Sequence, residues 1–112
     1  MVNGWLERLN QVPGVDAALA FTPEGYSVSG RFSRSFAQDV AQVASNLSFS
    51  IASTRERQLV TFEELGLGGP AVWAYVGSRA GLASDGQYVV HFDVEETNIA
   101  ELLDVMRTSE RQ

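Results

Sequence analysis

The sequence predicts an α+β fold: a single five-stranded antiparallel sheet with helices on its faces, in the order α-β-β-α-β-β-β-α. Two alternating segments near the start suggest a hairpin, and a helical pattern of about twenty residues follows them. An Asp85-Gly86 pair then marks a tight turn between two apolar segments. We expect residues 1–112 to form one domain, with 108–112 as a frayed tail.

The first elements have clear start and stop signals. A short amphipathic helix is predicted to begin near a cap at Asn3 and to end before Pro13 and Gly14. The segments VDAALAF and YSVSGRF then alternate between apolar and small or polar side chains. Between them, TPEG places Pro23 and Gly25 at positions that a type I turn favours, so the two segments are predicted to form a hairpin.

Residues 35–57 are predicted to form a long helix with two stripes. Large apolar side chains recur at steps of three and four and are expected to face the core: Phe36, Val40, Val43, Leu47 and Ile51. Beside them runs a stripe of small side chains: Ala37, Ala41, Ser45, Ser48 and Ala52. A flat stripe lets a second helix approach closely, so we expect it to be a dimer interface, with Phe49 as an anchor.

The last part of the chain is predicted to contain three strands and a helix. LVTFEEL is expected to be a short strand whose Val60 and Phe62 lie on a sheet edge that pairs with a second subunit. GLGGP is expected to be a hairpin turn, and AVWAYVGSRAGLAS one long strand in which Gly77 and Gly81 produce a bend or a bulge. QYVVHFDV forms the last strand, and Asn98 with Glu101 has the spacing of a capping box before the final helix.

The composition excludes several classes of function. The chain has no Cys, so thiolate nucleophiles and cysteine-based zinc sites are excluded. Its formal net charge is −6, without a basic stripe, which argues against nucleic acid and membrane surfaces as partners. The start of the chain has no leader-like pattern, and no long apolar run follows. We therefore expect a cytoplasmic protein.

The residues give no sign of catalysis. His91 is the single histidine, and no serine in a nucleophile context accompanies it. Asp93, Glu95 and Glu96 follow it, but one imidazole with carboxylates at a strand end is weak evidence for a metal. GLGGP lacks the lysine that follows in a phosphate-binding loop. The sequence predicts no enzyme and no catalytic, cofactor or metal site.

The stretch LERLNQVPGVDAALAFTPEGYSVS resembles the Roadblock family, which includes dynein light chains and bacterial GTPase-regulator domains. A short helix ends in PGV and leads into a hairpin with a glycine-containing turn, and the order of elements agrees through about Met106. The chain is most similar to short, free-standing prokaryotic members. The resemblance implies a homodimer or heterodimer in which the third strands pair and the long helices pack together. It also implies a role as adaptor, scaffold or regulator of a small GTPase.

The alternative is a small-ligand sensor of the PAS type, which shares two strands, helical material and three further strands. In such a fold the late aromatic residues would line a pocket: Trp73, Tyr75, Tyr88 and Phe92. A single uninterrupted helical pattern in the middle, and a helix before the hairpin, favour the interaction module.

Overall fold

A computed structural model describes residues 2–22, 25–30, 33–69 and 71–108. It contains four helices, α1 (Val2–Asn10), α2 (Arg34–Arg57), α3 (Leu59–Glu64) and α4 (Ile99–Thr108). The strands are β1 (Val15–Thr22), β2 (Gly25–Gly30), β3 (Trp73–Val76), β4 (Ala80–Ser84) and β5 (Tyr88–Asp93). They form one antiparallel sheet in the order β2-β1-β5-β4-β3, which confirms the predicted α+β class and strand number.

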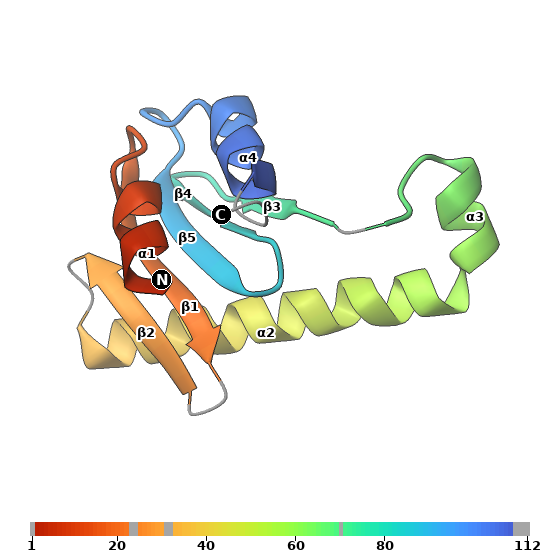
Figure 1. Ribbon diagram of the computed structural model, residues 1–112, viewed down its shortest axis with the longest axis horizontal. Helices are drawn as coiled ribbons and strands as arrows, with labels where there is room; N and C mark the ends of the chain where they lie inside the picture. Colours follow the sequence, from red (N-terminus) through yellow and green to blue (C-terminus); the bar gives the residue numbers. More distant parts are fainter. Residues whose placement is uncertain (1, 23–24, 31–32, 70, 109–112) are drawn as a thin grey trace.

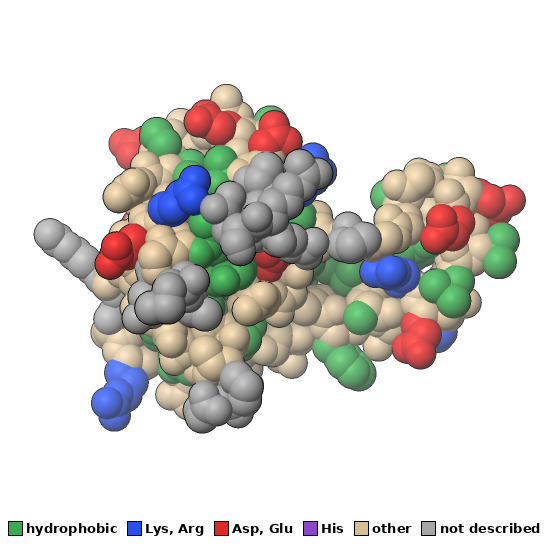
Figure 2. Space-filling view, viewed as in Figure 1, with side chains coloured by type: hydrophobic (Ala, Val, Ile, Leu, Met, Phe, Trp, Pro, Cys, Tyr) green, Lys and Arg blue, Asp and Glu red, His purple; other side chains and the backbone are tan. Residues whose placement is uncertain are grey.

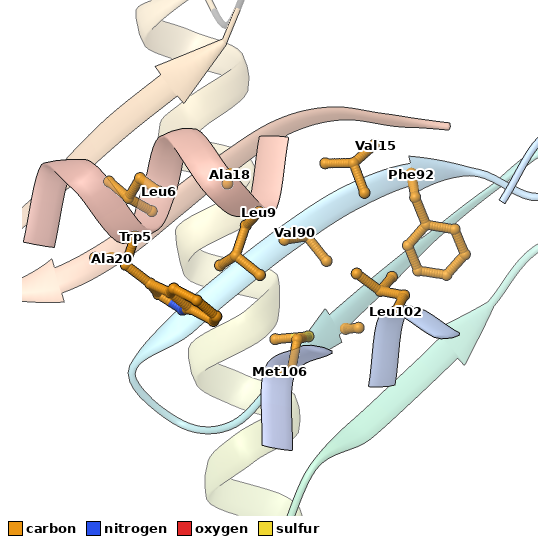
Figure 3. Close-up of a cluster of buried hydrophobic side chains, with 11 residues drawn as sticks. Trp5, Leu6, Leu9, Val15, Ala18, Ala20, Val90, Phe92, Leu102 and Met106 are labelled. Atoms are coloured by element: carbon orange, nitrogen blue, oxygen red, sulfur yellow. The ribbon is translucent and has the colours of Figure 1, made fainter. Parts of the chain in front are cut away.

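The sheet has helices on both faces (Figure 1). On one face, α1 and α4 cover a core that includes Leu6, Leu9, Phe92 and Leu102, whose side chains point toward one another (Figure 3). On the other face, α2 packs against a second cluster that contains Leu19 and Val89. Because successive strand residues point to opposite faces, Val89 lies in the core beneath α2 and Val90 in the core beneath α1 and α4.

Local signals set several boundaries as predicted. The β1–β2 hairpin is confirmed by the pairing of Thr22 with Gly25, whereas Pro23 and Glu24 lie outside the described residues. The Asp85 carboxylate accepts hydrogen bonds from two backbone amides of the β4–β5 turn, at 2.8 and 2.9 Å. The Asn98 side chain caps α4 by accepting from the amide of Glu101 at 3.1 Å. Each signal acts within a few residues, so it operates independently of the rest of the fold.

Residues Leu59–Glu64 form helix α3, so the prediction of a strand that begins at Leu59 is wrong. Valine and threonine favour strands only where a neighbouring strand supplies hydrogen bonds, and here the amide of Phe62 donates to the carbonyl of Gln58 instead. Gly66, with a φ of 75°, ends the helix, and the amide of Leu67 reaches back to the carbonyl of Phe62 at 2.7 Å. The GLGGP segment therefore links a helix to β3, with Pro70 outside the described residues.

The long strand expected after this loop is two strands, β3 and β4. A tight turn joins them, in which the amide of Gly77 donates to the carbonyl of Ala80 at 2.9 Å. The strand count stays at five because this division compensates for the strand that became α3. Gly81 does not form a bulge; its missing side chain makes room for the ring of Phe92.

Helix α2 is longer than the sheet that it crosses. Its N-terminal cap is Ser33, whose hydroxyl accepts from the amide of Phe36 at 3.2 Å, two residues before the expected cap at Ser35. All its buried residues lie in the first half of the helix: Ala37, Val40, Ala41 and Ala44. The second half extends beyond the sheet and carries α3 at its far end (Figure 1). We call this projecting part, residues 47–64, the arm.

Candidate interaction surface

The first half of the small-residue stripe lies against the sheet. Ala37 is 3% exposed and Ala41 is 7% exposed, so neither can contact a second chain, and this part of the predicted interface is wrong. The physical reason is the close approach of α2 to β1 and β5, which leaves space only for small side chains. Ser45 and Ala52 are exposed, and Ser48 is half-buried.

Part of the large apolar stripe, expected in the core, faces solvent. Phe36 is 40% exposed and Val43 is 48% exposed, while Val40 between them is buried. The residues of α2 that pack on the sheet are mostly alanines. Because a helix turns by a fixed angle per residue, Phe36 and Val43 then lie on the side of α2 that faces β3. Sequence periodicity found both stripes but assigned them to the wrong surfaces.

An open groove runs along this side of α2, and we call it the α2 groove. It has a volume of about 240 Å³. Helix residues form one wall and residues of β3, β4 and β5 form the other: Phe36, Asp39, Val40 and Val43 opposite Tyr75, Ala80, Gly81, Leu82 and His91. Tyr75 is 60% exposed. The groove is therefore mostly apolar, with a carboxylate and an imidazole among its lining groups.

His91 contributes a positioned polar group to this groove. Its Nδ1 lies 2.7 Å from Oδ1 of Asp16, and its ring meets the ring of Phe36 edge-on at 5.2 Å. The register between β1 and β5 shifts between Val15 and Ala17, and Asp16 lies at this irregularity. No aliphatic hydroxyl or thiol is present among the described groove-lining residues. The pair thus orients an imidazole without placing a nucleophile beside it.

The acidic segment after His91 has a local structural role. The Asp93 carboxylate accepts hydrogen bonds from the amides of Glu95 and Glu96, at 2.9 and 3.1 Å. In the described part of the chain, no three His, Cys, Asp or Glu side chains come together as a possible metal site. Asp93 instead shapes the turn that leads to α4.

A second groove lies under the arm. Its lining includes Ser48, Arg55 and Phe62 from the helices and Trp73 from β3, and its volume is about 270 Å³. The indole nitrogen of Trp73 donates to the hydroxyl of Ser48 at 3.1 Å. Ser48, predicted as an interface residue, therefore has a partner within its own chain.

The sheet edge next to both grooves is β3, not the segment around Val60. Val60 and Phe62 lie in α3, where Val60 is exposed and Phe62 is half-buried, so the predicted pairing edge is wrong. Among the described strands, β3 pairs with β4 alone, and its Tyr75 and Val76 are exposed. The missed signal was Gly77-Ser78, which marks a turn inside a segment of alternating apolar residues.

The arm and the residues that directly follow it expose further apolar side chains. Figure 2 shows such side chains on the part of the molecule that extends beyond the sheet. They are Phe49 on α2 and Leu59, Val60, Leu65 and Leu67 on and after α3. By the helical period, Phe49 lies on the side of α2 that faces away from the sheet, and it is 73% exposed.

The four aromatic residues of the sensor alternative do not share one pocket. Tyr88 and Phe92 pack with the α1 and α4 core. Trp73 belongs to the α2 face, and Tyr75 lines the α2 groove. The sheet separates the two pairs, so the aromatic pocket expected for a sensor does not form from these residues.

A match to a protein-family model covers residues of both cores. A family model described as "Uncharacterized conserved protein (DUF2173)" matches residues 5–108, from α1 to the end of α4. The chain belongs to the DUF2173 family. The DUF2173 match includes all five strands, the arm and the α2 groove. No curated protein matches the chain. None of the helices that the structure describes is both long and apolar enough to cross a membrane.

Proposed function

We propose that the protein is a non-enzymatic, dimeric interaction module of the Roadblock type that acts in the cytoplasm. The observation that carries the proposal is the exposed apolar surface formed by Phe36, Val43 and Tyr75 beside the β3 edge. Apolar side chains that cluster next to the unpaired edge of a strand form a surface that favours association. The resemblance to the Roadblock family supports the same assembly.

The proposed assembly uses two adjoining contacts. The β3 strand of one protomer pairs with β3 of its partner, which satisfies the exposed backbone groups of both edges. The two α2 helices then lie next to each other and cover Phe36 and Val43. This proposed interface uses α2 and a strand edge, as the sequence-based prediction did, but it involves different residues.

The mass of the protein in solution tests this proposal. Wild type is compared with Val43→Arg and Tyr75→Arg by light scattering and sedimentation equilibrium. Gln38→Arg is the matched control, because Gln38 is exposed on the same helix and faces away from the groove. Phe49→Ser shows whether the outer side of α2 also takes part.

We expect wild type and Gln38→Arg to be dimers, and the two groove variants to be folded monomers. The charge would be trapped in an apolar contact, where burying it without a partner is costly. Circular dichroism and thermal unfolding check that the variants keep their fold. A monomeric wild type, or groove variants that remain dimeric, would contradict the proposed function.

The partner class rests on the resemblance, which points to a small GTPase or a motor-type adaptor complex. A dimer of this kind could alter a GTPase by binding one conformation of its switch regions more tightly. We expect the small GTPase encoded nearest to the gene to change its rate of GTP hydrolysis or nucleotide exchange when the dimer is added. Unchanged rates together with no binding would favour the adaptor role.

A further inference from the structure

The groove under the arm lies between α2 and the segment that returns from α3 to β3, and we call it the arm pocket (Figure 1). Helix α2 contributes side chains at steps of three and four residues, which the helical period places on one face: Ser48, Ile51, Ala52 and Arg55. Phe62 of α3, Trp73 of β3 and Asp85 of the β4–β5 turn line the pocket from the other elements. Its volume of about 270 Å³ suits a small organic molecule.

Two aromatic rings supply apolar walls for the arm pocket. The hydrogen bond from the indole of Trp73 to the hydroxyl of Ser48, at 3.1 Å, holds the Trp73 ring in one orientation. Phe62 is half-buried and lines the pocket, whereas Leu59 and Val60 of the same helix are 54% and 73% exposed. Phe62 is therefore a side chain of α3 that turns toward the body of the protein. Aromatic side chains at a small pocket favour a ligand with a planar apolar group.

Arg55 supplies a cation to the same pocket. Its side chain is half-buried, and within the described part of the chain it forms no ion pair. A guanidinium presents several N–H donors in a planar fork, which matches the two oxygens of a carboxylate. Because Arg55 is partly shielded from water, its attraction for an anion is stronger than that of a fully exposed arginine. The pocket therefore favours a carboxylate at its Arg55 end.

Asp85 gives the pocket a direction. It lines the pocket from the β4–β5 turn, where its Oδ1 accepts hydrogen bonds from the amides of Gln87 and Tyr88 at 2.9 and 2.8 Å. These bonds hold the Asp85 carboxylate in the turn. A ligand carboxylate is repelled by this charge and attracted by Arg55, so the acid group of a ligand lies toward α2 and its apolar part lies against Trp73.

We propose that the arm pocket binds a small aromatic carboxylate, whose acid group pairs with Arg55 and whose ring packs against Trp73 and Phe62. Such a ligand contacts α2, α3 and β3 together, so its binding holds the arm against the body of the protein. The inference goes beyond the proposed dimer. The residues that carry the dimer proposal lie outside the arm pocket: Phe36, Val43 and Tyr75.

The two tryptophans of the chain make the test direct. In a proton–nitrogen NMR spectrum of the full chain, the indole N–H of Trp73 reports on the arm pocket. The indole N–H of Trp5, which is 6% exposed in the core beneath α1 and α4, is an internal control. The probe is phenylacetate. We expect its addition to shift the Trp73 signal until the shift saturates, and to leave the Trp5 signal in place.

Two variants and a neutral analogue of the probe test the role of each group. Arg55→Gln should weaken phenylacetate binding by more than about tenfold in dissociation constant, because it removes a charge-assisted hydrogen bond. Arg57→Gln is the matched control, since Arg57 is the exposed last residue of α2 and lies outside the pocket lining. Ala52→Leu narrows the pocket without changing its charge, so it should also weaken binding. Phenylacetamide has the same ring without the charge and should bind wild type and Arg55→Gln equally weakly.

The outcomes separate this inference from the proposed function. A Trp73 signal that stays in place at millimolar phenylacetate overturns the site, and equal binding by wild type and Arg55→Gln overturns the ion pair. Phenylacetamide or phenethylamine that binds as tightly as phenylacetate overturns the choice of a carboxylate. Backbone signals of the sheet that match wild type confirm that each variant is folded. Light scattering of the same samples gives the oligomeric state, so a monomer that binds phenylacetate supports the site while the proposed dimer fails.

Discussion

The indole of Trp73 donates a hydrogen bond to the hydroxyl of Ser48 at 3.1 Å, and it links the first residue of β3 to the middle of α2. It joins residues 25 positions apart in sequence and lies beyond Ala44, the last buried residue of α2. The bond therefore ties the helix to β3 at a position where the helix itself is no longer fully buried.

Removing this bond should cost stability without a loss of fold. Trp73→Phe keeps an aromatic ring but has no donor, and Ser48→Ala has no acceptor. We expect each to lower the free energy of unfolding by about 1 kcal/mol, the net value of a typical hydrogen bond. Denaturant unfolding of both variants and the double variant measures the coupling. Fully additive losses would show that the two side chains do not depend on each other.

The small residues of α2 should tolerate larger side chains only where they are exposed. Ala44 is fully buried against Leu19 and Val89, so Ala44→Leu should lower the free energy of unfolding by about 1–3 kcal/mol through overpacking. Ala52→Leu, on the exposed part of the same helix, should change it by less than about 0.5 kcal/mol. Equal effects in urea unfolding would contradict the close packing of α2 on the sheet.

Gly81 should resist even a methyl group. A Cβ atom at this position would lie 2.5 Å from Cζ of Phe92 and 2.8 Å from the carbonyl oxygen of Tyr75. Since the Phe92 ring is buried, Gly81→Ala should cost about 1–3 kcal/mol of stability. Gly4→Ala is the control: its site has open space, and alanine in helix α1 should stabilise by about 0.5–1 kcal/mol. Thermal unfolding of both variants gives the comparison.

Stability should fall at strongly alkaline pH because of Tyr88. Burial raises the pKa of the Tyr88 phenol above its ordinary value of 10.0, and the nearby Asp85 carboxylate raises it further. Above pH 10, the unfolded chain therefore loses this proton while the folded chain retains it, so rising pH favours unfolding. Tyr88→Phe removes this contribution. We expect wild type to lose more stability than the variant between pH 10 and 11, and parallel curves would show that Tyr88 makes no contribution.

The elements that could be predicted are those set by nearby residues. The Asp85 turn and the Asn98 cap satisfy backbone groups within three residues of the side chain that binds them. Leu59–Glu64 could not be predicted in this way, because its choice between strand and helix depends on whether a strand edge lies next to it. The assignment of Ala37 and Ala41 to the interface was wrong for a related reason. Periodicity identified the faces of α2, but it contains no information about the distance between the helix and the sheet.

The sequence by itself determined the α+β class, the β1–β2 and β4–β5 hairpins and the long central helix. These follow from periodicity, turn residues and composition, which act locally or on the whole chain. Only the tertiary structure decided that Ala37 and Ala41 face the sheet and that Phe36 and Val43 face solvent. The reason is packing: a helix that lies close to a sheet has room for small side chains, so the larger ones turn outward. The same packing places β3 at the exposed edge beside them.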